Sequence, residues 1–393
     1  MATEISKVCT DAALAGAACD PNADSVLFFV ESAGALIGQV YAPQDAGRVD
    51  GRELAARIDG ALAWEIEAAR HRALISRLEP APPPTVTATV AVCTRERPDL
   101  LAACIEGLVA ANLACLEILI VDNCPKTERT AQVVGRFPTV RYVREDQPGL
   151  NSARNCAFRE ARGDVVAFVD DDAVIDPDWL DRLLTPFSDP EVLAVTGLTL
   201  PLELRTVPQQ HFERLSGFSR RGFRRRTFCW PAHYPLSTGM VGAGVNMAIR
   251  RSALARLGGF DPALDAGTPT RSGGDHEYFA RILLAGYKIV YEPSAVNRHC
   301  HRQTWPDLKD VFLAYGVGTY AYWTRLLLID REVGVLRLAW LWFFKDQWPR
   351  LLRSCLDPRR SVERRLLLAE LFGCLLGPWR YLRSRRLHPR AGV

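Results

Sequence analysis

Three consecutive aspartates, Asp170, Asp171 and Asp172, directly follow the apolar run "VVAFV". Neighbouring carboxylates repel one another, and a buried, unpaired carboxylate is costly, so water or a cation must neutralise them. Carboxylate oxygens are the ligands that Mg²⁺ and Mn²⁺ prefer, and a diphosphate often shares such an ion. On an extended backbone Asp170 and Asp172 point to the same side, which predicts a metal–donor pair. Asp171 points to the other side and is expected to have a local structural role.

Two more polar groups follow apolar runs in the same part of the chain. The first run ends in "CTRERP", which contains Thr94, Arg95 and Arg97, and the second ends in Asp122-Asn123. A guanidinium group can bind phosphate or carbonyl oxygens, and Asp122 can accept hydrogen bonds from a base or a ribose. A single acid at a strand end is most often a turn former or a helix cap. Three such groups together favour a nucleotide site.

The elements that must position these residues alternate along the chain. Helices are predicted at "PDLLAACIEGLVAA", "TERTAQVVGRF" and "GLNSARNCAFREA", and strands at "TVTATVAV", "LEILIVD", "VRYVRE" and "DVVAFVD". This order predicts a mostly parallel sheet with helices on both faces. Ligands bind such sheets at the carboxyl ends of the strands, where all three polar groups fall.

A smaller module is predicted in front of this region, over residues 1–79. "SVLFFVES" and "ALIGQVYA" predict a hairpin, and residues 51–78 have apolar positions at helical spacing. The prolines of "EPAPPPT" cannot continue a helix, so residues 80–84 are predicted to form a stiff linker between two domains.

Composition narrows the classes of protein. Of the 393 residues 48% are apolar and 24% charged, which is typical of a globular protein, and a net charge of +4 does not indicate nucleic-acid binding. The 11 cysteines form no CxxC pair, and the first residues have the acids Glu4 and Asp11 with only Lys7 as a base. These features argue against disulfides and a signal peptide, and predict a cytoplasmic protein. No GxGxxG follows the first strand and no P-loop motif occurs.

The motifs together resemble those of a known family. "VAVCTRERPDLL", "ILIVDN", "GLNSARNCAFREARGDVVAFVDDDA", "VGAGVNMAIRRSALARLGGFDPAL" and "GGDHEYFARILLAGYKIVYEPSAVNRHCHR" are similar to segments of family 2 glycosyltransferases with the GT-A fold. The resemblance runs from Thr85 to Arg302 and implies a catalytic domain over residues 85–305. It implies a Rossmann-like, mixed, mostly parallel sheet, a nucleoside-diphosphate sugar as donor, Mn²⁺ or Mg²⁺ as cofactor, and an inverting mechanism.

The resemblance also implies roles for single residues. Asp275 aligns with the general base, although the glutamate that usually precedes it is replaced by Gly274 and Glu277 lies two residues on. Asp275 could equally cap a helix. The donor-sugar and acceptor region would include Gly244, Asn246 and Glu277. The metal would be held by Asp170, Asp172 and His299, and the nucleotide sugar by Thr94, Arg95, Arg97, Asp122, Arg154, Asp170 and Asp171.

Two histidines, His299 and His301, lie in "RHCHR" and share one face of an extended segment. No second pair at zinc spacing is nearby. The resemblance implies that a histidine here completes the metal coordination, and His299 is the better-aligned candidate.

An arginine-rich run, "RRGFRRRTFCW", precedes "VGAGVNM". Three readings remain open for it: a solvated face, a loop that meets a membrane or an anionic acceptor, and, least favoured, a nucleic-acid contact. We expect no nucleic-acid partner.

The C-terminal region, residues 306–393, is basic and aromatic. From Lys345 onward it has twelve basic and four acidic residues beside Trp, Phe and Leu, with no uncharged stretch long enough to span a bilayer. This pattern predicts helices in the membrane interface, on the cytoplasmic face. The alternative is that these helices only pack on the catalytic domain.

Three functions are compatible with these patterns. The first is a metal-dependent inverting glycosyltransferase that acts on a glycolipid, polysaccharide or other glycan acceptor. The second is a nucleotidyltransferase acting on a sugar phosphate, which needs no acceptor-side base such as Asp275. The third is a catalytically silent nucleotide- or carbohydrate-binding protein with the same fold.

Overall fold

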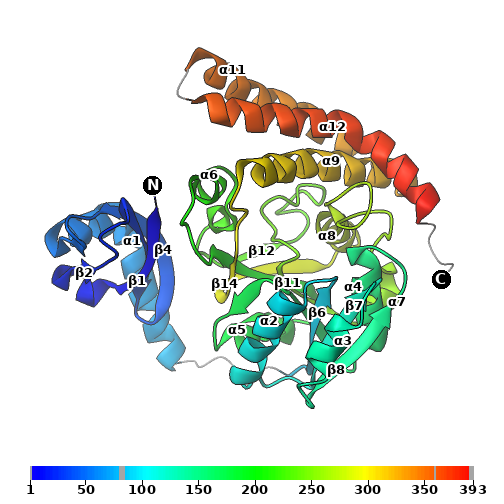
Figure 1. Cartoon of the computed structure of the whole chain (residues 1–393), viewed down its shortest axis with the longest axis horizontal. Helices are drawn as coiled ribbons and strands as arrows, with labels where there is room; N and C mark the ends of the chain where they lie inside the picture. The colour runs from blue at the N-terminus through cyan, green and yellow to red at the C-terminus, as the bar shows by residue number, and fades with distance from the viewer. Residues whose placement is uncertain (1, 79–84, 358–359, 389–393) are drawn as a thin grey trace.

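The computed structural model describes residues 2–78, 85–357 and 360–388. Figure 1 shows three parts: a small sheet and helix at the N-terminal side, a central α/β unit, and long helices that lie across one side of that unit. The predicted linker, residues 80–84, lies outside the described residues, so the domain boundary stays a prediction.

The central sheet has the strand order β10-β14-β11-β13-β9-β6-β7-β8, with β12 paired to β14. Strands β9, β6, β7 and β8 are parallel neighbours, whereas β13 runs antiparallel between β9 and β11. The predicted mixed, mostly parallel sheet of the GT-A fold is therefore confirmed. The strands are β6 (Ala88–Thr94), β7 (Glu117–Asn123), β8 (Val140–Glu145), β9 (Val165–Asp170), β10 (Ala173–Ile175), β11 (Val192–Pro201), β12 (Arg226–Phe228), β13 (Asn246–Arg250) and β14 (Lys288–His299).

Helices cover both faces of this sheet. On one face α4 buries Ala153 and Cys156 against strand residues such as Leu119 and Phe168. On the other face α2 buries Leu101 and Ile105. Both layers consist of buried apolar side chains, which explains why the strands are apolar on both sides. The helices of this unit are α2 (Pro98–Ala110), α3 (Arg129–Val134), α4 (Leu150–Glu160), α5 (Trp179–Leu184), α6 (Val207–Ser216), α7 (Ser252–Leu257) and α8 (Gly274–Leu284).

The N-terminal part contains the predicted hairpin, β3 (Ser25–Ser32) and β4 (Ala35–Pro43), and the predicted helix, α1 (Gly51–Leu78). A strand that sequence reasoning did not assign, β1 (Thr3–Cys9), pairs with β3 in parallel. Short elements complete this part: η1 (Thr10–Ala15), β2 (Ala17–Ala18) and β5 (Arg48–Val49). The helix buries Leu54, Ile58, Leu62, Ile66 and Ala69 on the sheet.

The small sheet also packs on the central unit. Leu27 and Phe29 of β3 belong to the same apolar cluster as Leu200 and Leu204. The backbone N–H of Thr3 donates to the carbonyl of Leu204 over 3.0 Å. The N-terminal sheet therefore buries both of its faces, one under α1 and one against β11.

The C-terminal helices are α9 (Trp305–Ile329), α10 (Gly334–Leu341), the π-helical turn η4 (Trp342–Gln347), α11 (Trp348–Leu356) and α12 (Ser361–Leu387). Helix α12 lies along α9 (Figure 1). Glycines allow this close approach, because a Cβ at Gly316 would collide with the Glu370 carbonyl and one at Gly377 would lie 2.7 Å from the Val317 carbonyl. Within the described part of the chain, no helix combines the length and the apolar character that crossing a bilayer requires.

Glu370 provides a pH test of the contact between α9 and α12. Burial raises the pKa of Glu370 to about 7, and its Oε2 atom has no hydrogen-bond partner among the described residues. Because the folded state holds this proton more tightly than the unfolded chain, the contribution of Glu370 to stability is fully present below about pH 4.5 and is lost as the pH rises through about 7. Glu370→Gln is expected to raise the free energy of unfolding at pH 8 by about 1–3 kcal/mol. Denaturant unfolding at pH 8 and pH 4.5 checks this, because at pH 4.5 the two proteins should be equally stable.

Candidate active site

The strand register brings the polar strand ends together. On β6, Thr94 lies beside Asp122 of β7, and Cys93 lies beside Asp170 of β9. The next strand segment, β10, pairs antiparallel with the end of β14, so that Ala173 is opposite His299. This pairing places His299 beside the aspartates, although it lies 127 residues after Asp172 in the sequence.

Asp170, Asp172 and His299 form a cluster in which one ligand atom of each lies within 4.8 Å of the others. Asp172 Oδ1 is 3.3 Å from His299 Nε2. This carboxylate oxygen and His299 Nδ1 are both buried without a hydrogen-bond partner among the described residues. Burial, followed by repulsion from Asp172, raises the pKa of Asp170 to about 6. Two carboxylates and an imidazole with orphaned buried atoms fit a divalent cation.

Asp171 is used differently from its neighbours. Its two carboxylate oxygens accept hydrogen bonds from Thr94 Oγ1 (2.6 Å) and from Arg97 Nη1 (3.1 Å). Arg97 Nη1 also lies 3.3 Å from Asp172 Oδ2. Asp171 therefore ties the end of β6 to the turn after β9, which agrees with the local structural role expected from the alternation of side chains, and its contact with a nucleotide stays a prediction. Thr94 is buried in this contact, whereas Arg97 remains partly exposed.

Asp122 is completely buried at the end of β7. Tyr142 donates a hydrogen bond to its Oδ2 atom over 3.0 Å, while Oδ1 has no partner among the described residues. Burial raises the pKa of this carboxyl group. Arg95, which directly follows β6, reaches the loop at Gly267. Asp122 Oδ1 is thus a buried strand-end oxygen that the described residues leave without a hydrogen-bond partner.

Arg154 lies between the candidate metal ligands, Asp170, Asp172 and His299, and the start of α8. Its Nη1 atom forms an ion pair with Asp265 Oδ2 at 2.7 Å, and its guanidinium lies 5.5 Å from the centre of the Phe260 ring. Burial by itself lowers the pKa of Arg154, but Asp265, Asp275 and Asp170 outweigh it and raise the pKa. Sequence reasoning missed Asp265, although it follows "GGFDP" by a few residues. Its partner could not be found from spacing, because the two are 111 residues apart.

Asp275 lies at the first turn of α8. Its Oδ2 atom accepts a hydrogen bond from the backbone N–H of Gly244 (2.7 Å), and Oδ1 accepts one from that of His276 (2.8 Å). Burial alone raises its pKa, but the charges of His276 and Arg154 and these two hydrogen bonds outweigh it and hold the pKa below its usual range. Gly244 is required here, because a Cβ would lie 2.5 Å from Arg154 Nη2 and 3.2 Å from Asp275 Oδ2.

Two residues expected in the donor-sugar and acceptor region lie elsewhere. Glu277 is fully buried and binds Arg281 (2.6 Å) and Arg325 of α9 (3.0 Å). It faces the core rather than the site because α8 carries it to the side opposite Asp275's contacts with Gly244. Asn246 Nδ2 donates to the carbonyls of Leu198 and Ala295, so it links strands in the core. Neither side chain is available to a substrate.

His301 does not belong to the group of candidate metal ligands, because its side chain pairs with Glu213. Its Nε2 atom lies 2.9 Å from Glu213 Oε2 of α6, and both side chains are buried. The ring is tilted against His299, with 5.9 Å between the centroids. His301 therefore supports His299 from the side, and it is not part of the ligand cluster.

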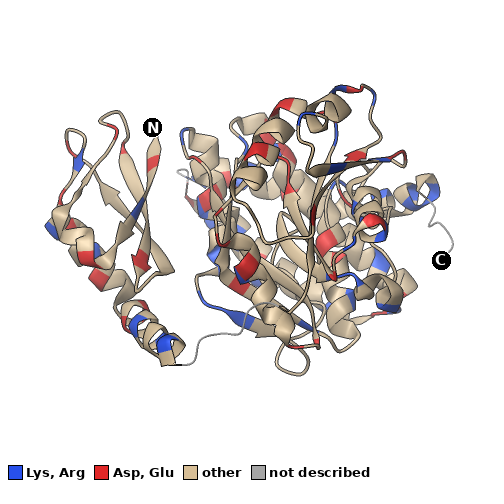
Figure 2. Cartoon of the chain, turned by 90° about the horizontal axis from the view of Figure 1, so that it is seen from below, with Lys and Arg blue, Asp and Glu red and all other residues tan. Residues whose placement is uncertain are grey.

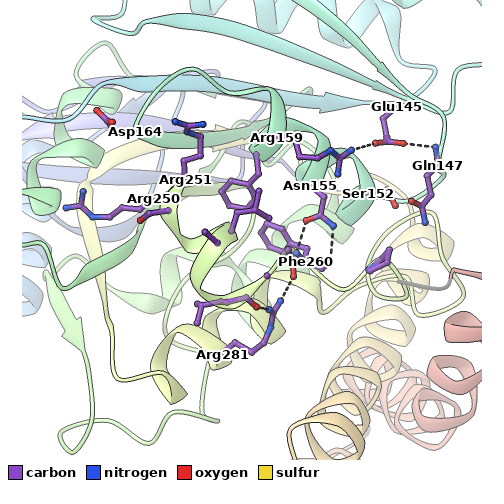
Figure 3. Close-up of a pocket in the computed structure, with 18 of the residues that line it drawn as sticks. Glu145, Gln147, Ser152, Asn155, Arg159, Asp164, Arg250, Arg251, Phe260 and Arg281 are labelled. Atoms are coloured by element: carbon purple, nitrogen blue, oxygen red, sulfur yellow. Dashed lines mark hydrogen bonds and ion pairs between the residues drawn. The ribbon is translucent and has the colours of Figure 1, made fainter. Parts of the chain in front are cut away.

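A cavity of about 1210 Å³ lies beside α4 and α7, away from this cluster. Figure 3 shows Asn155 bonded to the backbone of Phe260 in its wall and the ion pair between Arg159 and Glu145 at its rim. None of the strand-end aspartates lines it, and neither does Asp275. The charged groups at its rim are largely paired within the protein.

Comparison with known proteins gives the family. Residues 89–258 match the family model described as glycosyl transferase family 2. A succinoglycan biosynthesis protein, ExoM, of Rhizobium meliloti is 30% identical over 223 residues, which is 54% of this chain and 67% of the relative. The chain belongs to glycosyltransferase family 2.

Two further relatives of this glycosyltransferase are informative. A glucosyl-dolichyl phosphate glucuronosyltransferase of Haloferax volcanii is 28% identical over 228 residues, covering 54% of this chain and 68% of the relative. The mannosyltransferase PcManGT of Pyrobaculum calidifontis, solved with GDP-Man and Mn²⁺, is similar in fold, with a TM-score of 0.53 and 18% identity over 80% of this chain and 94% of that one. The segment matched by the family model contains the three aspartates, Arg154 and Gly244, but ends before Asp275 and His299.

Proposed function

We propose that this glycosyltransferase moves a sugar from a nucleoside-diphosphate sugar to a hydroxyl group of a glycolipid, polysaccharide or other glycan, with inversion at the anomeric carbon. The observation that carries the proposal is the arrangement of two carboxylate sites around Arg154. Asp170 belongs to a metal-ligand cluster on one side, and Asp275 is a separate carboxylate on the other. One site suits a diphosphate with its cation, and the other suits a proton acceptor.

The metal would be Mn²⁺ or Mg²⁺, held by Asp170, Asp172 and His299, and would neutralise charge on the leaving diphosphate. The chain itself supplies the rest. Asp275 is ionised at neutral pH and accepts the proton of the attacking hydroxyl group. The two backbone N–H groups fix its orientation. A single displacement with one base inverts the anomeric carbon.

The acceptor side favours this reaction over nucleotidyl transfer. A nucleotidyltransferase acting on a sugar phosphate needs no carboxylate like Asp275. The structurally similar mannosyltransferase was solved with GDP-Man and Mn²⁺, which supports a metal-bound nucleotide sugar here as well. A catalytically silent binding protein needs no proton acceptor, whereas Asp275 is a partly exposed, ionised carboxylate beside Arg154.

The experiment is a panel of nucleotide sugars with Mn²⁺ or Mg²⁺, in which thermal shift and the released nucleotide are measured. Release of a nucleoside diphosphate supports the proposal. Release of pyrophosphate or nucleoside monophosphate would favour the nucleotidyltransferase, and absence of any thermal shift would favour the silent binding protein.

We further propose that the C-terminal helices hold the enzyme on the cytoplasmic face of a membrane. Apolar side chains recur every four residues from α10 to α11, and each is between 44% and 83% exposed: Leu336, Trp340, Phe344, Trp348, Leu352 and Leu356. A second exposed row on α12 consists of Leu368, Phe372, Leu375, Trp379 and Leu382. Neither row packs on the catalytic unit, whereas the other face of α12 does.

Basic residues accompany both rows. Arg337, Lys345 and Arg353 are exposed on the first segment, and Arg365, Arg383, Arg385 and Arg386 on α12. Figure 2 shows Lys and Arg along the helix that leads to the C-terminus. Exposed Trp, Phe and Leu beside cations match a helix that lies in the interface of an anionic bilayer.

Removal of part of this apolar surface tests the membrane proposal. The double variant Leu375→Ser/Trp379→Ser is expected to bind vesicles of phosphatidylcholine and phosphatidylglycerol at least about tenfold more weakly, because two apolar side chains no longer enter the bilayer. Leu14→Ser/Trp64→Ser is the matched control, since Leu14 and Trp64 are 72% and 67% exposed in the N-terminal part. Co-sedimentation measures both, and equal losses would contradict the proposal.

A further inference from the structure

Arg221 has an unusual environment for an arginine in an arginine-rich run. It ends the short helix η3 (Phe218–Arg221), between α6 and β12. Its Nη2 atom donates to the carbonyl of Gly242 over 2.8 Å. Its Nε atom is buried without a hydrogen-bond partner, and no carboxylate within the described residues forms an ion pair with it.

The other arginines of the run are accounted for by the protein. Arg224 pairs with Glu65 of α1 at 2.7 Å, and Arg225 pairs with Glu292 at 3.5 Å. Arg220 and Arg226 are exposed, and Arg220 donates to the carbonyl of Leu215. Most arginines of the run thus form ion pairs within the protein or are exposed to solvent. Arg221 differs, because it is largely buried and has no ion pair within the described residues.

Arg221 lies between the two halves of the proposed active site. Its guanidinium is 5.6 Å from the centre of the Phe218 ring, and the same ring meets His299 edge-on at 5.9 Å. On the other side, its acceptor Gly242 is two residues from Gly244, which binds Asp275. The guanidinium therefore faces the region between the metal cluster and the base.

A cation in such a place needs an anion. Burial lowers the pKa of Arg221, which shows that the protein supplies too little negative charge to compensate for lost hydration. The nearest carboxylate that influences it is Asp275, which Arg154 also neutralises. A half-satisfied guanidinium that keeps partial access to solvent is suited to an incoming oxyanion.

We infer that Arg221 binds a phosphate oxyanion of a substrate, an inference that rests on the proposed function. The oxyanion could come from the diphosphate of the donor or from a phosphate of a lipid-linked acceptor. In the first case the acceptor oxygen bonds to the anomeric carbon and gives its proton to Asp275, while the bond from that carbon to the diphosphate oxygen breaks. The electron pair of the broken bond stays on the diphosphate oxygen, and Arg221 stabilises the charge that develops there. In the second case Arg221 orients the acceptor toward Asp275.

Calorimetric titration of the full chain tests this inference without requiring turnover. The probes are inorganic pyrophosphate with Mn²⁺, for the donor, and farnesyl phosphate, for the acceptor. Arg221→Gln is expected to bind one of the two about ten- to a hundredfold more weakly than the wild type, because a charge-assisted hydrogen bond is lost. Arg220→Gln, which removes the same charge from the exposed neighbouring residue, should bind as the wild type does. Arg221→Lys should recover part of the affinity.

The probe that weakens identifies the source of the oxyanion. Unchanged affinity of Arg221→Gln for both probes, or failure of the wild type to bind either, would overturn the inference. A melting temperature of Arg221→Gln that falls while Arg221→Lys restores it without restoring affinity would also overturn it, since Arg221 would then only hold the loop at Gly242. Wild-type pyrophosphate binding without nucleoside diphosphate release from any donor would reject the proposed function and leave the oxyanion site in place.

Discussion

Asp275→Asn is expected to lower the rate of sugar transfer by about a thousandfold, because general-base catalysis contributes factors of about 10²–10⁴. The amide cannot take the proton of the acceptor hydroxyl. Donor and metal binding should be retained, since the cluster of Asp170, Asp172 and His299 does not include Asp275. Steady-state kinetics, together with titration of the nucleotide sugar and Mn²⁺, separates the two effects.

Glu277 supplies the matched control for Asp275. Both carboxylates lie in the first turn of α8, but Glu277 binds Arg281 and Arg325 in the core. Glu277→Gln is expected to cost several kcal/mol of stability, because the buried Arg281 loses its carboxylate partner and the buried Arg325 keeps only Asp261 and Asp330. Asp275→Asn should lower the melting temperature less than Glu277→Gln does, since Asp275 accepts two backbone hydrogen bonds and forms no ion pair within the described residues. Transfer at the wild-type rate by Asp275→Asn would show that another group is the base.

Asp172→Asn is expected to weaken Mn²⁺ binding by about a hundredfold and to remove the stabilisation that the metal gives to the folded protein. Asp172 Oδ1 is buried and has no hydrogen-bond partner in the described chain, so it is available as a ligand, whereas Oδ2 contacts Arg97 at 3.3 Å. The melting temperature of the wild type should rise with Mn²⁺, and that of Asp172→Asn should not. Chelation of the metal should abolish transfer by the wild type.

A variant of the adjacent Asp171 separates the loss of metal binding from a loss of structural contacts. Asp171→Asn should keep the rise in melting temperature with Mn²⁺ and lower the melting temperature without metal, because Asp171 binds Thr94 and Arg97 in a buried position. If Asp171→Asn instead lost the Mn²⁺ effect and Asp172→Asn kept it, the assignment of the two neighbours would be reversed.

Local sequence patterns predicted those helices, strands and turns whose structure depends mainly on residues close together in the chain. The apolar strands, the helix of residues 51–78 and the hairpin before it depend on periodicity and turn residues, which are readable within a few positions. The parallel βα order then placed Thr94, Asp122 and Asp170 at one edge without further information, since strand ends of such sheets coincide. Alternation along the backbone was enough to separate Asp171 from its neighbours.

Tertiary structure decided which polar side chains are left for a ligand. His299 reaches the aspartates only because β14 pairs with β10, and Arg154 meets Asp265 across 111 residues. Glu277 and Asn246 fit the sequence motif as well as Asp275 and Gly244 do. However, Glu277 forms an ion pair with Arg325 of α9, and Asn246 donates hydrogen bonds to the neighbouring strands. Sequence by itself therefore determined the family, the sheet and the edge at which its polar strand-end residues gather. The ion pairs and buried contacts between distant segments determined which charges are neutralised within the protein and which are not. Neutralisation depends on the distance between charges in space and not along the chain.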